Sequence, residues 1–285
     1  MRTLIIAGFT VQEAISRRLV LAGLLLSAAF LGLYSLGFAF LYGNILGAAA
    51  RRPTGQEVEM LVAGAVLTSL GLYALHFLSS FVALFLSVNA ISGEIDAGTL
   101  HAILARPIRR VEFVVGRWLG FALLASLYVA LMASALLLIA RLIAGFEAPA
   151  PAVVIGLMIL SALLLLTLSL LGSTLLPTLA NGVVVFSLFG LAWLAGVIEF
   201  IGGTLSNQAM VNLGIAVSLL VPSDGLWRAA SFFVQPPALL ALSPGRLASP
   251  FTAVAPPTAP FLWWSAAYVV VCLLAAVRAF ARRDL

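Results

Sequence analysis

Residues 91–117 read ISGEIDAGTLHAILARPIRRVEFVVGR and separate two long apolar runs. The stretch holds seven of the 25 charged side chains of the chain (15 basic and 10 acidic), together with His101. The apolar run on each side is longer than the ~20 residues that a helix needs to cross the hydrocarbon core of a bilayer. The stretch therefore predicts two membrane-spanning helices joined by a charged turn in water.

The composition extends this prediction to the whole chain. Hydrophobic residues make up 63% of the sequence and charged residues only 9%, and the mean hydropathy is +1.19. A soluble domain cannot hide that much apolar surface. We therefore predict an all-α integral membrane protein with a single transmembrane domain over residues 1–285. Its six spans are expected at about 19–41, 60–90, 113–140, 152–176, 182–202 and 261–280. Pro177, Asn181 and Gly182 are expected to interrupt the helix between the fourth and fifth spans with a tight turn.

The first eighteen residues differ from the spans that follow. They combine the apolar side chains Leu4, Ile5, Phe9 and Ile15 with charges at positions 2, 13, 17 and 18, and no convincing small-residue cleavage site follows them. We interpret residues 1–18 as an interfacial amphipathic helix whose apolar side dips into the membrane. An ordinary solvated lead-in is the alternative.

The arginines set the predicted orientation, because positive charge stays on the cytoplasmic side of a membrane protein. With six spans, ten of the fifteen basic residues fall on the side of the N-terminus. These ten are Arg2, Arg17, Arg18, Arg106, Arg109, Arg110, Arg117, Arg278, Arg282 and Arg283. We therefore expect both termini to be cytoplasmic, in the inner (plasma) membrane of a prokaryote.

The segment 203–260 is the least membrane-like part of the chain. It contains most of the prolines, and its apolar stretch 210–221 is too short to cross a bilayer. We predict short helices on the outer face between the fifth and sixth spans, with an extra span or a re-entrant helix as the alternative. Trp263 and Trp264 suit the interface where the sixth span begins.

All fifteen basic residues are arginine, so the chain has no lysine. The standard phosphate-binding loop of ATPases requires a lysine that reaches the nucleotide phosphates. Any nucleotide energy must therefore come from another polypeptide, and we predict that this chain is not an enzyme.

The charged turn has the features of a docking element. Glu94 and Asp96 precede a short predicted helix over 100–105, and Gly98 and Thr99 offer cap chemistry. Pro107 then stops this helix. In it Leu100, Ile103 and Leu104 supply an apolar face, and Arg106, Arg109 and Arg110 are available for acidic groups or anionic lipid. The alternative is that these arginines only enforce topology.

These residues resemble the cytoplasmic loop of ABC-2 type transporter permeases. The shared pattern is Glu94, then 98–100 as Gly-Thr-Leu, Arg106-Pro107, Arg110 and 116–117 as Gly-Arg. The sequence LVPSDGLWR at 220–228 is similar to a Pro-x-Asp-x-x-x-Arg stretch of relatives. Those relatives include the permease of the system that matures the copper site of nitrous oxide reductase.

The resemblance implies a division of labour. Two six-span subunits, here a homodimer, would form the membrane path of an exporter. Two separate ATPase subunits, which carry ATP and Mg²⁺, would dock on residues 94–110 as a coupling helix. Closure of the ATPase pair would push this helix and produce alternating access.

Polar residues inside the spans are candidates for the substrate pathway, because they are costly in lipid. They are His76, Asn89, Asn181 and Glu199, and for His76 a neutral ring bonded to a neighbouring helix is the simpler interpretation. The two histidines, single cysteine and five methionines lack ligand spacing, so we predict no metal site. The net charge of +5 follows from topology and gives no basis for nucleic-acid binding.

Two other functions are compatible with the sequence. An ion- or proton-coupled secondary carrier would use His76 and Glu199 for coupling, although no long internal repeat is evident. A membrane assembly factor without transport is the third possibility.

Overall fold

The computed structural model describes residues 2–16, 18–49, 56–96, 109–242, 249–253 and 255–282. Within these ranges the chain is helical apart from turns and one isolated bridge between Ser249 and Thr252. Six of the described helices are long and apolar enough to cross a membrane, which confirms the predicted all-helical, six-span fold. They are α2 (Arg18–Ala49), α3 (Gln56–Ser87), α6 (Arg110–Ala144), α7 (Pro151–Leu175), α8 (Thr178–Thr204) and α13 (Ala259–Ala281).

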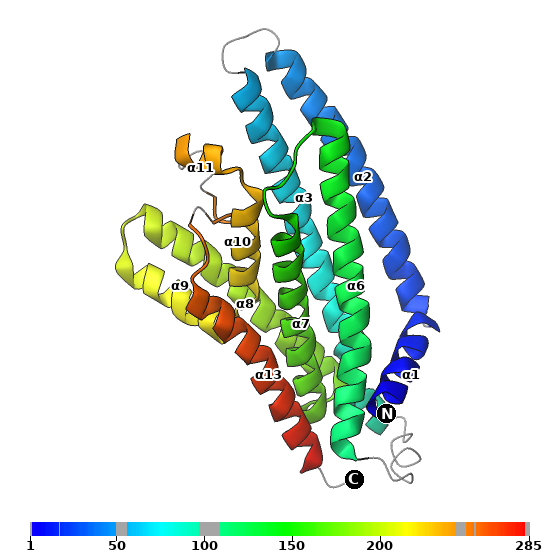
Figure 1. Ribbon diagram of the computed structural model, residues 1–285. Coiled ribbons are helices and arrows are strands. Elements are labelled where there is room, and N and C mark those ends of the chain that lie inside the picture. The colour runs from blue at the N-terminus through cyan, green and yellow to red at the C-terminus, as the bar shows by residue number, and fades with distance from the viewer. Residues whose placement is uncertain are drawn as a thin grey trace.

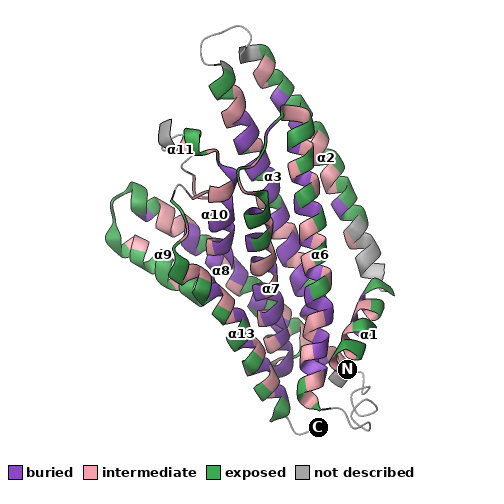
Figure 2. Cartoon of the chain, in the orientation of Figure 1, coloured by how far each residue is buried: buried purple, intermediate pink, exposed green. Residues whose placement is uncertain are grey.

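Helix α7 lies at the centre of the bundle (Figure 1), where it packs against α3, α6, α10 and α13. Within the most apolar stretch of α7, 61% of the residues are buried inside the protein, compared with 17% for α2. The difference is visible in Figure 2, in which α7 is mostly buried and α2 carries long exposed stretches. Because the exposed side chains of α2 include Leu33 and Phe40, this helix presents hydrocarbon to its surroundings, as a lipid-facing span does.

Local sequence explains where the spans end. Gly145 adopts a left-handed conformation with φ of 62° and ends α6, a conformation that glycine adopts without steric cost. Pro151 begins α7 at the first helical position, where its missing N–H is not needed. Pro177 then separates α7 from α8.

The predicted break at 177–182 is shorter than expected. Asn181 and Gly182 lie inside the first turns of α8, and the Asn181 N–H donates to the carbonyl of Pro177 at 3.0 Å. Asn181 is fully buried, and its Nδ2 donates to the carbonyls of Val88 and Ser169, each at 2.9 Å. A polar residue that looked like a helix breaker or pathway group therefore ties α8 to the end of α3 and to α7.

The N-terminal segment forms helix α1 (Arg2–Ser16), which packs along the beginning of α6. Leu4, Ile5, Phe9 and Ile15 are all exposed on α1. The N-terminus lies at the same end of the bundle as the last turn of α13 and the short helix α4 (Ser92–Asp96). Because the predicted docking segment runs from α4 to α6 at this end, we call it the docking end.

Short helices separate α8 from α13. Helix α9 (Gln208–Leu220) returns along α8, and α10 (Ser223–Val234) then turns away by 103°. Asn207 caps α9 by accepting hydrogen bonds from two backbone N–H groups. Helix α11 (Pro237–Leu242) follows. The sequence predicted short helices in this segment but gave bounds only for the stretch 210–221. Helix α10 packs against α7 with Leu226 and Trp227 fully buried.

Candidate functional site

The predicted docking segment is described only at its two flanks. Glu94 lies in α4, and Asp96 is the last residue of that helix. Arg109 precedes α6 and Arg110 begins it. The remaining predicted docking residues lie outside the described residues: Gly98, Thr99, Leu100, Ile103, Leu104, Arg106 and Pro107.

Arg117 joins the flanks of this segment to α1. It lies in α6 and is only 5% exposed. Its Nη1 donates to Glu13 Oε2 of α1 at 2.7 Å, and its Nη2 forms an ion pair with Glu94 of α4. The guanidinium also lies 5.6 Å from the centre of the Phe113 ring. Because a buried guanidinium needs charged partners, this ion triad holds α1, α4 and α6 in one arrangement.

Two glycines let α1 lie close against α6. A Cβ on Gly116 would come within 2.7 Å of the side chain of Ile6, and a Cβ on Gly120 would come within 2.7 Å of Thr10 Cβ. Gly120 also faces the carbonyl of Ala7, which a Cβ would approach to 2.8 Å. Small residues at such positions allow helix backbones to approach closely. Helix α1 therefore packs closely against the start of α6.

Arg110 is engaged within the chain. Its Nη1 donates to the carbonyls of Phe280 at 3.3 Å and Ala281 at 3.0 Å. These carbonyls belong to the last turn of α13, where a cation also complements the helix dipole. The Phe113 ring stacks on Phe280 in the same region, with centroids 5.8 Å apart. The structure therefore gives Arg110 an internal contact in addition to its predicted docking role, whereas Arg109 is exposed.

The pathway candidates do not form one site. His76 lies buried in α3, where its ring stacks on Trp227 at 5.7 Å and lies 5.9 Å from Phe189. Asn89 lies in the turn between α3 and α4, close to the docking end. Glu199 lies near the end of α8 and belongs to a separate ion cluster.

This second cluster is centred on Arg228 of α10. The Arg228 Nη2 donates to Glu199 Oε2 at 2.5 Å, and the Arg228 Nε lies 3.3 Å from Asp224 Oδ2. The side chains of Arg228 and Asp224 are 18% and 8% exposed. Sequence reasoning noted Asp224 and Arg228 only as part of a resemblance, although opposite charges four residues apart in so apolar a chain are a signal by themselves.

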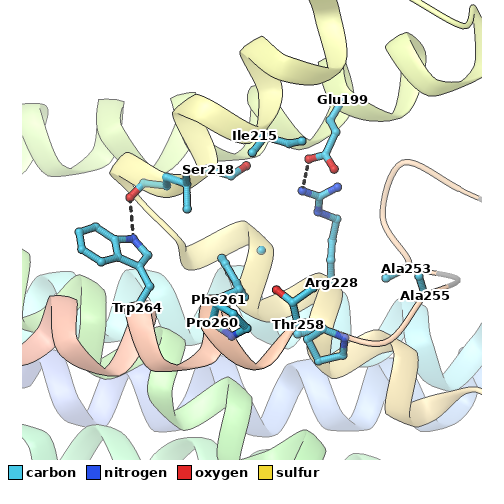
Figure 3. Close-up of a pocket in the computed structure, with 14 residues that line it drawn as sticks. Glu199, Ile215, Ser218, Arg228, Ala253, Ala255, Thr258, Pro260, Phe261 and Trp264 are labelled. Atoms are coloured by element: carbon cyan, nitrogen blue, oxygen red, sulfur yellow. Dashed lines mark hydrogen bonds and ion pairs between the residues drawn. The ribbon is translucent and has the colours of Figure 1, made fainter. Parts of the chain in front are cut away.

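A cavity of about 790 Å³ borders this cluster (Figure 3). It lies between α9, α10 and the start of α13. Its lining residues are Glu199, Ile215, Ser218, Leu219, Gly225, Arg228, Ala229, Ala253, Ala255, Pro257, Thr258, Pro260, Phe261 and Trp264. Among the predicted pathway residues, Glu199 is the one that lines it. Over the described ranges of the chain, no three His, Cys, Asp or Glu side chains are grouped so that they could hold a metal ion.

Comparison with known proteins identifies the fold family. No curated protein matches the chain. The family model described as ABC-2 family transporter protein matches residues 6–285, which is nearly the whole chain. The match identifies the family and does not distinguish the subgroup of the nitrous oxide reductase system, to which residues 220–228 are similar. The chain therefore belongs to the ABC-2 family of transporter proteins, and it is a multi-pass membrane protein of the kind that forms the permease component of an ABC transporter together with an ABC ATPase.

Proposed function

We propose that this chain is the permease subunit of an ATP-driven exporter and that two copies form its membrane path. A separate ATPase, which holds ATP and Mg²⁺, docks on residues 94–110 and pushes this segment as it closes on nucleotide. The motion passes into the spans and alternates access between the two sides of the membrane. Both termini then lie in the cytoplasm of a prokaryote, and lipid of the plasma membrane surrounds the spans.

The observation that supports this proposal most is the Arg117 triad. The docking segment leaves the bundle at α4 and re-enters it at α6, and Arg117 links Glu94 of α4 to Glu13 of α1. A displacement of the segment is therefore transmitted to α6 and α1 through the ion pairs of the buried Arg117. A loop that only enforced topology would not need such a connection.

The orientation is supported by charge and by geometry together. The N-terminus, α4 and the last turn of α13 lie at one end of the bundle. The same end carries ten of the fifteen arginines under the predicted topology. Labelling of single cysteines at Ser16 and Leu205, in a Cys272→Ser background, from either side of sealed vesicles tests this orientation. Cytoplasmic labelling of Leu205, which is 67% exposed at the end of α8, would contradict it.

The docking surface is tested by charge insertion. Leu100→Asp with Leu104→Asp places two carboxylates on the predicted apolar face, and the ATPase should no longer co-purify because buried unpaired charge opposes association. Leu205→Asp is the control, because it makes the same kind of change at an exposed position. Leu205 directly follows the last turn of α8, far from the predicted docking segment in the sequence. Retention of the ATPase by the double variant would refute the docking assignment.

The finer resemblance to the copper-maturation permease defines a narrower proposal. It rests on Pro222, Asp224 and Arg228, of which Asp224 and Arg228 form the ion cluster described above. Co-expression with the components of that maturation system, followed by an assay of the copper content of nitrous oxide reductase, tests it. An unaltered copper content in the absence of this permease would refute the assignment to the copper-maturation subgroup and leave the family assignment intact.

A further inference from the structure

The cavity beside Arg228 has a polar end and an apolar wall (Figure 3). Glu199, Arg228 and Ser218 supply the polar groups. The apolar wall includes Ile215, Leu219, Ala229, Pro260 and Phe261. Sites for small ligands have this character, with mostly apolar walls and a few polar groups that fix orientation.

Ser218 provides an unused hydrogen-bonding group in this cavity. It is 6% exposed, and its Oγ has no hydrogen-bond partner among the described residues. Other helical hydroxyls in this chain, such as those of Ser27 and Thr68, donate to the carbonyl four residues earlier. A buried hydroxyl without a partner is unfavourable. Because Ser218 lines the cavity, an occupant that reaches its Oγ would satisfy this group.

The ion cluster that borders the cavity contains two carboxylates and one guanidinium, of which Glu199 and Arg228 line the cavity. Arg228 pairs with both Glu199 and Asp224. One guanidinium cannot neutralise two carboxylates, so an occupant with a positive head is favoured over an anion.

The position of the cavity suits an amphiphile. Trp264, near the start of α13, lines the cavity and is 43% exposed, and its Nε1 donates to the carbonyl of Leu219 at 2.9 Å. Tryptophan is typical of the interface between lipid and water. The volume of about 790 Å³ is sufficient for a polar head and part of a hydrocarbon chain.

We propose that this cavity binds an amphiphile with an ammonium head. The ammonium group pairs with the Glu199 carboxylate and donates a hydrogen bond to Ser218 Oγ, and the hydrocarbon lies along Ile215, Leu219 and Phe261. Two sources share this chemistry: phosphatidylethanolamine of the membrane and a transported single-chain amine. The proposal does not depend on ATPase docking, because binding is measured on the permease alone.

The test uses the full chain in nanodiscs of phosphatidylglycerol, a lipid without an ammonium group. The probe is a dodecylamine with a photoreactive diazirine in its chain, and the matching alcohol is the neutral control. Labelled peptides are located by mass spectrometry, and the yield is measured against probe concentration. Glu199→Gln and Ser218→Ala remove the two contacts of the head. Glu147→Gln is the matched control, since Glu147 pairs with Arg141 at 3.0 Å in an exposed position.

The proposal predicts saturable labelling by the amine within 215–229 or 258–264. It predicts that Glu199→Gln weakens binding by about tenfold, that Ser218→Ala weakens it less, and that Glu147→Gln leaves it unchanged. Ile215→Trp, which fills the cavity without touching the charges, should block labelling even if Glu199→Gln folds poorly. Competition by phosphatidylethanolamine at low mole fraction would identify a lipid site. Resistance to that lipid, with competition by unlabelled dodecylamine, would identify a site for transported amines. Equal binding of the alcohol, or unchanged binding to Glu199→Gln, would overturn the proposal.

Discussion

Arg117 and Arg228 each pair with two carboxylates, but their surroundings differ. The Arg117 side chain is 7% exposed and joins three separate elements at the docking end, α1, α4 and α6. The Arg228 side chain is 18% exposed, joins α8 and α10, and borders a cavity. A guanidinium with two carboxylates therefore forms a closed ion cluster at Arg117 and borders an open cavity at Arg228.

The comparison shows that the packing around an ion cluster determines what the cluster can do. Around Arg117, glycines bring α1 against α6 and close the space. Around Arg228, the chain bends by 103° between α9 and α10, and space remains beside the charges. We expect substitutions in the first cluster to affect stability and coupling, and substitutions in the second to affect ligand binding.

The largest effect is expected for Arg117→Met. It leaves Glu13 and Glu94 without their shared cation, and removal of one partner from a buried pair costs about 3 kcal/mol. Thermal unfolding of the purified permease measures this loss. Arg141→Met is the control, because Arg141 is 67% exposed in its pair with Glu147 and exposed pairs contribute little. Equal unfolding temperatures for the two variants would contradict the closed ion cluster.

Gly120→Leu tests the glycine contact that closes this ion cluster. Its side chain would collide with Thr10 Cβ and the carbonyl of Ala7, which a Cβ alone already approaches to 2.7 and 2.8 Å. Overpacking of this kind costs about 1–3 kcal/mol, and proteolysis of α1 should accelerate as the helix is displaced. Gly156→Leu in α7 is the matched control, because a Cβ there meets nothing within 4 Å. Equal proteolysis rates would show that α1 is not held by this contact.

Glu94→Gln and Glu199→Gln compare the two clusters directly. The first leaves Arg117 with Glu13, which is 39% exposed, and the second leaves Arg228 with Asp224, which is 8% exposed. A buried charge is stabilised less by a solvated partner, so we expect a loss of about 1–2 kcal/mol for Glu94→Gln and under about 1 kcal/mol for Glu199→Gln. Denaturant unfolding of both variants measures this difference. A larger loss of unfolding free energy for Glu199→Gln than for Glu94→Gln would contradict the expected difference between the clusters.

Arg110→Ala is expected to have the smallest effect on stability. It removes two hydrogen bonds to the last turn of α13, which we expect to cost about 0.5–1 kcal/mol. Hydrogen exchange of the amides near residue 280 should accelerate. Arg109→Ala should leave that exchange unchanged, because Arg109 is exposed and its backbone N–H, which the substitution retains, donates to Glu112. Faster exchange in both variants would assign the effect to general loss of charge.

The sequence predicted the parts of the fold that depend on hydrophobicity along the chain. Long apolar runs correspond to the six long helices, because a span must be apolar over its whole length. Short helices were expected between the fifth and sixth spans, but α10 was not located because it carries Asp224 and Arg228, which pair only after folding. The extent of the break before α8 was overestimated because Asn181 finds its partners in α3 and α7, far from it in sequence.

The candidate site was predictable to a similar degree. The charges of 91–117 indicated a partner surface, and the resemblance placed Arg117 in the motif. Its pairing with Glu13 could not be inferred, because the two residues are 104 positions apart. Glu199 was recognised as costly in lipid, but its partners and the cavity depend on the bend between α9 and α10.

The central claim is that the docking segment moves the spans through Arg117. We would measure it with a cysteine at Thr258, which is exposed beside the cavity, in a Cys272→Ser background with the ATPase bound. The rate of maleimide labelling is compared with and without ATP and vanadate. We predict that nucleotide changes this rate at least about threefold in the otherwise unaltered complex. We also predict that Arg117→Met abolishes the change although the ATPase still binds and hydrolyses ATP. An undiminished response in Arg117→Met would contradict the account.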